Sequence, residues 1–325
     1  QRLAERHREE YDIPIVGITG SNGKTIVKEW LYQLLSPEMN VTRSPRSYNS
    51  QIGVPLSVWL LNEQSQVGVF EAGISEPGEM QALRGIIQPD IAVLTFIGDA
   101  HQKNFSSLEE KCREKVVLFH DTKTIVYCKD DEVVDRVVRS VGYKGENLAW
   151  SMSDRSAALF VESVERKGLT STIHYIYNGE TGEYVLPFID EASVRNSVTT
   201  AVVALYLGLS RERLAERMAS LEPVAMRLEV KKGQRGCTLI NDSYNSDINS
   251  LDIALDFMSR RPDHKGRKRT LILSDIYQPG EPLDDLYTEV SNLCVQRGVE
   301  KIIGIGPQIM EHADLIEVGE KYFFH

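Results

Sequence analysis

Gly17-Ile18-Thr19-Gly20-Ser21-Asn22-Gly23-Lys24-Thr25 follows the short apolar run 13–16 and leads into a segment, 27–34, whose apolar residues recur at helical spacing. A glycine-rich turn between a strand and a helix brings backbone N–H groups to phosphate oxygens, and the helix N-terminus adds the positive end of its dipole. Lys24 would reach the terminal phosphates, and the Thr25 hydroxyl would bind Mg²⁺. Ile18 departs from the common loop pattern, which has a small residue there. An ordinary glycine-rich turn explains the glycines but not Gly-Lys-Thr at the helix start, so the stretch favours nucleotide binding.

The composition is that of an ordinary water-soluble globular protein. The chain has 325 residues, of which 42% are hydrophobic and 26% charged, enough for two domains that each bury a core. Its formal net charge of −10 argues against a nucleic-acid partner, which normally meets a basic face. No apolar stretch approaches the roughly 20 residues needed to cross a bilayer, so no membrane insertion is expected. The four cysteines are far apart and form no C-x-x-C pair, which is typical of a reduced, cytoplasmic protein.

Strand-like and helix-like segments alternate through the first 150 residues, which predicts a parallel sheet covered by helices with ligands at the carboxyl ends of its strands. The predicted strands are 13–19, 67–72, 90–96 and 123–128, and the predicted helices are 24–35, 77–88, 107–119 and 131–141. Residues 156–188 change to a period of two, broken by Asn178-Gly179, which predicts antiparallel strands with a hairpin turn. Helices resume at 191–207 and 211–220.

A second β/α alternation follows a boundary at Glu222-Pro223. Its predicted strands are 237–241, 269–275 and 301–305, and its predicted helices are 250–260 and 283–297. The fold class is therefore α/β, with the end of a linker helix at 1–12, a central domain at 13–222 and a C-terminal domain at 223–325. Because the chain starts with Gln1 and ends in the strand-like Phe323-Phe324-His325, we expect a fragment whose second domain is incomplete.

Two polar residues follow predicted strands at the sheet edge that carries the glycine-rich loop. Glu71 ends the apolar run 67–70, where a carboxylate is well placed to bind Mg²⁺. An ordinary solvated glutamate at a strand end explains it as well. His101 follows the run 91–96, and by itself it reads as a polar loop histidine. The loop and Glu71 at the same edge give it more weight.

Lys115 lies close to Leu108, Cys112 and Phe119 on the apolar face of the helix 107–119, with Lys111 at the margin of that face. A lysine centred on an apolar stripe is costly to keep charged, so its pKa should fall. A neutral amine can react with CO₂ to give a carbamate, which converts a cation into a metal-binding anion. From spacing alone, a lysine whose stem packs on the core while its ammonium reaches solvent is the favoured reading.

Asp242 ends the first predicted strand of the second domain, within Asn241-Asp242-Ser243-Tyr244-Asn245. It would face a switch point of the kind at which α/β sheets bind ligands. A plain turn competes strongly, because these residues form turns easily.

Taken together, these segments resemble the Mur ligases, the ATP-dependent amide-forming enzymes of peptidoglycan synthesis. Within the family the chain is most similar to the type that joins UDP-N-acetylmuramoyl-tripeptide to D-alanyl-D-alanine. The motifs that carry the resemblance are 19–25, Tyr48-Asn49-Ser50-Gln51-Ile52-Gly53-Val54-Pro55, 71–73, His101, 115–119, Arg195-Asn196, Arg227-Leu228-Glu229 and 242–245 with Ser250. They run from residue 14 to about residue 306, and their order and spacing are specific.

The resemblance implies a P-loop ATPase domain with a small antiparallel β region, followed by a Rossmann-like domain, and it implies a role for each matched residue. Lys24, Lys115 and His101 would be catalytic, and Thr25, Glu71, His101 and Lys115 would hold two Mg²⁺ ions. Asn49 and Ser50 would bind substrate. ATP would be bound by Gly20, Ser21, Asn22, Gly23, Lys24, Thr25, Asn196, Arg227, Asp242, Tyr244 and Asn245. Lys115 matches the lysine that is carbamoylated in the family, which reverses the reading from spacing alone.

Several positions depart from the family pattern. Arg195-Asn196 replaces the usual His-Asn pair, and Thr199 replaces a second asparagine, which puts the adenine contacts in doubt. The loop 47–50 keeps only Asn49 of the usual asparagines. The N-terminal UDP-binding domain and the last strands of the C-terminal domain are expected outside this chain, so the chain alone would bind nucleotide without turning over. Some proteins of this type are fused to an alanine racemase, which an end in mid-domain would allow.

The implied reaction begins when the tripeptide carboxylate attacks the γ-phosphate of ATP, giving an acyl phosphate that the amine of D-alanyl-D-alanine then displaces. Two anions must approach each other, so most of the protein's work is electrostatic positioning. Two alternatives remain open. One is a related ligase for another amino acid, or a folylpolyglutamate synthase. The other is a non-catalytic nucleotide-binding module.

Overall fold

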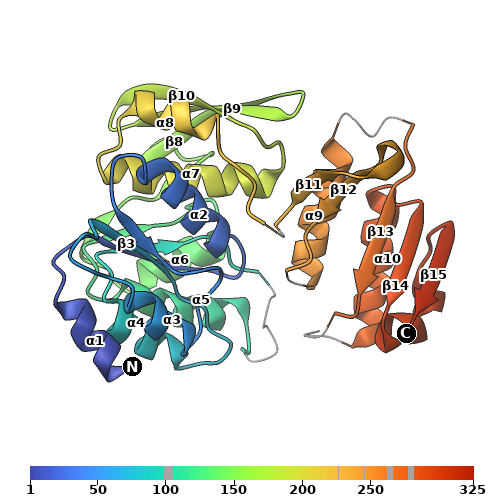
Figure 1. Ribbon diagram of the computed structural model, residues 1–325, viewed down its shortest axis with the longest axis horizontal. Coiled ribbons are helices and arrows are strands. Elements are labelled where there is room, and N and C mark those ends of the chain that lie inside the picture. The colour runs from blue at the N-terminus through green and yellow to red at the C-terminus, as the bar shows by residue number, and fades with distance from the viewer. Residues whose placement is uncertain (99–104, 226, 245, 262–265, 277–281) are drawn as a thin grey trace. The chain divides into compact units, whose positions relative to one another are not determined.

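The computed structural model describes residues 1–98, 105–225, 227–244, 246–261, 266–276 and 282–325. These residues form two compact units (Figure 1). The first contains most of the chain up to Glu222, and the second contains Pro223–His325. Each unit has its own buried core.

The first unit is built on a six-stranded sheet in which every neighbouring pair is parallel. In spatial order its strands are β2 (Val41–Arg43), β3 (Val67–Glu71), β1 (Ile15–Thr19), β4 (Ile91–Leu94), β5 (Thr124–Val126) and β6 (Glu146–Asn147). Its helices are α1 (Arg2–Glu9), α2 (Lys24–Leu35), α3 (Gly53–Val58), α4 (Glu79–Ile87), α5 (Leu108–Val116), α6 (Glu132–Ser140), α7 (Glu191–Tyr206) and α8 (Arg211–Met218). The expected parallel sheet with alternating helices is confirmed.

The central strand β1 fixes where the site forms. Its five residues are all buried, as expected for a parallel strand covered on both faces. It pairs with β3 on one side, where Ile18 lies opposite Glu71, and with β4 on the other, where Thr19 lies opposite Leu94. The loop that leaves β1 therefore emerges between the carboxyl ends of β3 and β4.

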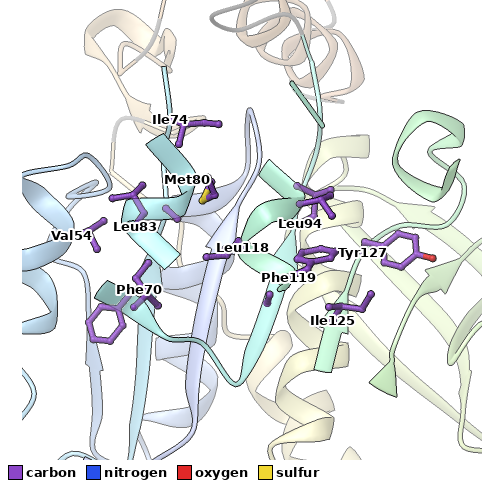
Figure 2. Close-up of a cluster of buried hydrophobic side chains, with 14 of the residues drawn as sticks. Val54, Phe70, Ile74, Met80, Leu83, Leu94, Leu118, Phe119, Ile125 and Tyr127 are labelled. Carbon is purple, nitrogen blue, oxygen red and sulfur yellow. The ribbon is translucent and has the colours of Figure 1, made fainter. Parts of the chain in front are cut away.

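The core of the first unit holds that sheet edge in place. Figure 2 shows apolar side chains of α3, α4, β3, β4 and β5 gathered with two from the 3₁₀ turn Val117–Phe119 and with Ile74 and Tyr127, which follow β3 and β5. The labelled members are Val54, Phe70, Ile74, Met80, Leu83, Leu94, Leu118, Phe119, Ile125 and Tyr127. Each apolar side chain fully removed from water contributes about 1.5–3 kcal/mol, so this cluster anchors α5 and the sheet as one body.

The predicted antiparallel region is also present. The strands β8 (Leu159–Lys167), β9 (Thr170–Tyr177) and β10 (Glu180–Leu186) pair antiparallel, and β7 (Trp150–Ser151) adds to β8 in parallel. Asn178 and Gly179 form the predicted two-residue turn between β9 and β10, and both have positive φ, 52° and 78°.

The second unit contains two separate sheets rather than one continuous β/α alternation. The strands β13 (Thr270–Ser274), β14 (Lys301–Ile305) and β15 (Glu320–Phe324) form a parallel sheet, with helices α9 (Ile248–Arg260), α10 (Leu283–Gln296) and α11 (Pro307–Glu311). The strand β12 (Thr238–Asn241) instead pairs antiparallel with β11 (Glu229–Lys232). Among the described strands, Asp242 therefore follows a two-stranded hairpin. Asp242 follows the end of a strand, as expected, but that strand belongs to a hairpin rather than to a β/α alternation, because hydrophobic runs do not reveal which strand pairs with which.

The sequence did not predict β2, α3, β6, β7, β11 or α11. Each has six residues or fewer, too short for a periodic pattern to show. The helix α3 in addition contains Pro55 in its first turn. Among the residues that the structure describes, no helix is both long and apolar enough to cross a bilayer.

Candidate nucleotide and metal site

The loop 20–23 joins β1 to α2 and is held tightly against the end of β4. Ser21 N donates to Phe96 O at 2.6 Å, and Thr95 Oγ1 donates to Asn22 O at 2.5 Å. Gly20 has φ 144°, and a Cβ added there would lie 2.1 Å from Thr95 Oγ1. Only glycine fits so close to the neighbouring strand. No side chain therefore covers the loop backbone at this position.

Lys24 is the first residue of α2, and its side chain folds back over the loop. The ammonium Nζ donates to Gly20 O at 2.7 Å and to Ser21 O at 3.0 Å. The cation therefore lies beside the loop backbone, at the positive end of the α2 dipole. Two sources of positive potential converge there, the arrangement that binds a polyphosphate.

Thr25 and Glu71 meet beside the loop. Thr25 Oγ1 donates to Glu71 Oε2 at 3.1 Å and lies 3.0 Å from Ser47 Oγ. Asn49 Nδ2 also donates to Glu71 Oε2, at 3.2 Å. Glu71 is fully buried, so the solvated strand-end reading of this residue is wrong.

The residues present fit a nucleotide with Mg²⁺. Asn22 Nδ2 in the loop is a buried donor that makes no hydrogen bond among the described residues, and it suits a phosphate oxygen. The buried Glu71 carboxylate supplies oxygens of the kind that bind Mg²⁺, with Oε1 lying 3.0 Å from the Lys28 ammonium. No group of three or more His, Cys, Asp and Glu is gathered within the described part of the chain. Mg²⁺ needs no such group, since it binds through one or two carboxylates, substrate phosphates and water.

Lys28 belongs to this cluster as well, although no motif in the sequence singles it out. It lies one helical turn after Lys24 on α2, is fully buried, and places Nζ 3.0 Å from Glu71 Oε1. The signal was present in the sequence, because residues i and i+4 share a helix face. What the sequence did not show is that this face packs against the end of β3.

Lys111 and Lys115 are both buried on α5, with exposed fractions of 1% and 4%. Burial, then the positive charges of Lys24 and Lys111, hold the pKa of Lys115 well below its usual value. Lys24 and Lys111 are therefore the cations that oppose protonation of the Lys115 amine. The expectation that its ammonium reaches solvent is wrong. Lys111 was placed at the margin of this face, but its Nζ is buried and donates to Gly98 O at 2.5 Å.

Asn196, on α7, contacts the loop. A Cβ added at Gly23 would lie 2.5 Å from Asn196 Oδ1, so this buried amide touches the residue that caps α2. Thr199, one turn further on, accepts a hydrogen bond from Trp150 Nε1 at 3.0 Å. The guanidinium of Arg195 lies 5.8 Å from the Phe96 ring centre and 6.0 Å from that of Trp150.

The remaining predicted residues are placed as follows. Ser50 Oγ accepts from Gly53 N at 3.2 Å, at the start of α3. In the second unit, the Arg227 guanidinium lies 3.9 Å from the Tyr244 ring centre, and Leu228 N donates to Asp242 Oδ1 at 3.1 Å. Burial raises the pKa of Asp242 to about 6. His101 and Asn245 lie outside the described residues.

A matched pair of glycines tests the loop. Gly23 and Gly78 are both helix N-caps, with φ of 89° and 86°, but a Cβ at Gly78 would meet nothing within 4 Å. We expect Gly23→Ala and Gly78→Ala each to cost about 1–2 kcal/mol of stability, because both force an L-residue into a left-handed conformation. Only Gly23→Ala should weaken ADP binding, about tenfold or more by calorimetry, since it also displaces Asn196. Equal ADP affinities of the two variants would contradict this account of the loop.

A glycine-rich loop between a parallel strand and a helix, with a lysine and a threonine opening that helix, defines a P-loop nucleotide-binding protein. The family model described as Mur ligase middle domain matches residues 18–204, more than half of the chain. The chain belongs to the Mur ligase family.

Among curated relatives, UDP-N-acetylmuramoyl-tripeptide–D-alanyl-D-alanine ligase of Bacillus subtilis is 24% identical over 309 residues, which cover 94% of this chain and 65% of the relative. Among solved structures, MurF ligase of Thermotoga maritima in complex with ADP matches with a TM-score of 0.84 at 22% identity, covering 100% of this chain and 73% of that one. The apo form of L. casei FPGS matches with a TM-score of 0.69 at 15% identity, covering 99% and 90%. This chain thus spans about two thirds of the Bacillus relative.

Proposed function

We propose that this chain is the ATP-binding part of a ligase that joins D-alanyl-D-alanine to UDP-N-acetylmuramoyl-tripeptide through an acyl phosphate. The observation that carries the proposal is the convergence of the loop 20–23, Lys24, Thr25 and Glu71 at one sheet edge. The names of the curated relatives supply the two substrates. A fused alanine racemase is not part of the proposal.

The chain's own groups would do the electrostatic work. Lys24 and the backbone N–H groups of the loop would offset the charge that shifts onto the phosphate oxygens as the γ-phosphate is transferred. Thr25 and Glu71 would hold Mg²⁺, which supplies further charge neutralisation when bound. The buried Asn22 amide, whose Nδ2 makes no hydrogen bond within the part of the chain that the structure describes, would donate to a phosphate oxygen.

Lys115 would act as a carbamate in this proposal, anchoring a second Mg²⁺. The residue is 4% exposed, its side chain forms no ion pair among the described residues, and the pKa of its amine is lowered chiefly by burial. Both features favour the neutral amine, which is the form that reacts with CO₂. His101 would join the metal ligands, and Asn49, Ser50, Asn196, Arg227, Asp242, Tyr244 and Asn245 would contact the ligands as the family resemblance implies.

Product analysis tests the activity. The whole protein that contains this chain is incubated with ATP, Mg²⁺, UDP-N-acetylmuramoyl-tripeptide and D-alanyl-D-alanine, and the products are followed by mass spectrometry. We expect ADP, phosphate and the amide product in equal amounts, because each amide bond consumes one ATP.

Parallel reactions separate the alternatives. Amide formation with single amino acids or with a folate and glutamate, and none with D-alanyl-D-alanine, would replace the proposal by the related ligase. ADP binding without ADP formation in any mixture would support the non-catalytic module instead.

A further inference from the structure

The Lys28 ammonium is fully buried at the sheet edge and lies among four oxygens. Nζ is 3.0 Å from Glu71 Oε1 and 3.0 Å from Glu29 Oε1. It donates to Ser44 O at 2.8 Å and to Arg46 O. Lys28 has no exposed surface, and burying a charged side chain is costly unless fixed partners compensate its charge. The four oxygens supply that compensation.

Lys28 fixes how the Glu71 carboxylate presents its two oxygens. Oε2 accepts hydrogen bonds from Thr25 and Asn49, whereas Oε1 accepts none from the residues described and lies 3.0 Å from the ammonium. The carboxylate is thereby held between Lys28 and Thr25 in a single orientation. Thr25 is the neighbour that the P-loop pattern assigns to Mg²⁺.

Lys28 also fixes the segment 44–49, which supplies two more members of the cluster. Arg46 has φ 49°, a left-handed conformation that non-glycine residues rarely adopt, and its carbonyl accepts from the ammonium. Directly after it, Ser47 contacts Thr25 and Asn49 contacts Glu71. One cation thus ties α2 and the end of β3 to this segment.

We propose that Lys28 is a positioning residue for magnesium, acting by holding Glu71 and the segment 44–49 around Thr25. It touches neither nucleotide nor metal in this proposal. The inference rests on the proposed function, since it requires that the loop bind a magnesium nucleotide.

The test measures how much Mg²⁺ tightens ADP binding, by calorimetry on the whole protein with Mg²⁺ and with EDTA. In the unsubstituted protein we expect Mg²⁺ to tighten ADP binding about 5–150-fold, a typical coupling between two ligands. In Lys28→Met, which keeps the length of the side chain without its charge, we expect that factor to fall to about 1, whereas the affinity in EDTA stays within about twofold. In Glu71→Gln, Mg²⁺ should likewise no longer tighten ADP binding. The double variant with Lys28→Met and Glu71→Gln should lose no more of this tightening than either single variant.

Glu29→Gln is the matched control. Glu29 lies as close to Lys28 as Glu71 does, but its other oxygen, Oε2, pairs with Arg43 at 3.1 Å, and 21% of its side chain is exposed. It should keep the full effect of Mg²⁺. Should Lys28→Met fail to fold, Lys28→Arg decides, because its planar group keeps the charge but does not match the same four oxygens. A reduced effect of Mg²⁺ at unchanged affinity in EDTA supports the inference.

An unchanged effect of Mg²⁺ in Lys28→Met, or in Lys28→Arg where that variant decides, overturns the inference and leaves the proposed function intact. If Glu29→Gln also loses the tightening of ADP binding by Mg²⁺, the inference is overturned, because Lys28 would then not act by positioning Glu71. Failure of the unsubstituted protein to bind ADP at all overturns the proposed function itself. The two failures are therefore distinguishable.

Discussion

Under the proposed function, Lys115→Ala is expected to lower the turnover of the whole protein that contains this chain about 10²–10³-fold, the range seen when one group that stabilises the transition state is removed. Formate or acetate should restore part of the activity, because a small carboxylate can occupy the space of the proposed carbamate. Initial rates of ADP release with and without added formate check this. Full activity of the alanine variant would rule out the role of Lys115.

Two further variants separate the carbamate from a packing role. Lys115→Arg keeps a cation but cannot form a carbamate, so it should be as inactive as the alanine variant and show no rescue by formate. Lys115→Met should also be inactive, yet melt at a higher temperature, because the buried amine has an unfavourably lowered pKa and methionine removes that cost. An inactive methionine variant that melts lower would point to lost packing instead.

Lys24→Met is expected to reduce turnover about 10³-fold and to weaken ADP binding measurably, because it removes the ammonium that lies beside the loop at Gly20 O and Ser21 O. In this variant, the negative charge that shifts onto the phosphate oxygens would no longer be offset by the Lys24 ammonium. Steady-state rates with saturating ATP and calorimetry with ADP measure the two effects separately.

The matched control is Lys123→Met. Lys123 precedes β5, is 77% exposed, and pairs with Asp90 at 2.7 Å at the amino-terminal edge of the sheet, opposite to the loop. It should leave both turnover and ADP affinity unchanged. Equal losses in the two variants would mean that net charge, rather than the position of Lys24, sets the rate.

Much of the first unit could be predicted from the sequence because its signals are local. The order of strands and helices, the loop 20–23 and the hairpin at Asn178-Gly179 each follow from periodicity, glycine placement or turn chemistry within a few residues. The parallel arrangement of the strands places their carboxyl ends at one edge. Glu71 could therefore be associated with the loop from the sequence.

The partners of the buried charges could not be predicted in this way. No sequence motif pointed to Lys28, and helical periodicity placed Lys111 at the margin of its helix face, yet both ammonium groups are buried on specific oxygens. Asn49 was expected at the substrate, and the structure shows its amide bound to Glu71. These contacts join residues 13 to 43 positions apart along the chain, beyond the range of any local pattern.

The sequence by itself determined a P-loop α/β protein with a phosphate loop, a lysine–threonine pair at the start of α2 and a carboxylate at the end of β3. The tertiary structure decided which charges neutralise one another and which strands pair. It buried Lys28 against Glu71, and it paired β12 with β11 rather than with the parallel sheet. The physical reason is the distance along the chain over which each feature is decided. Secondary structure follows from residues that are neighbours in sequence. Ion pairing and strand pairing depend on which segments, distant in sequence, pack against each other and exclude water.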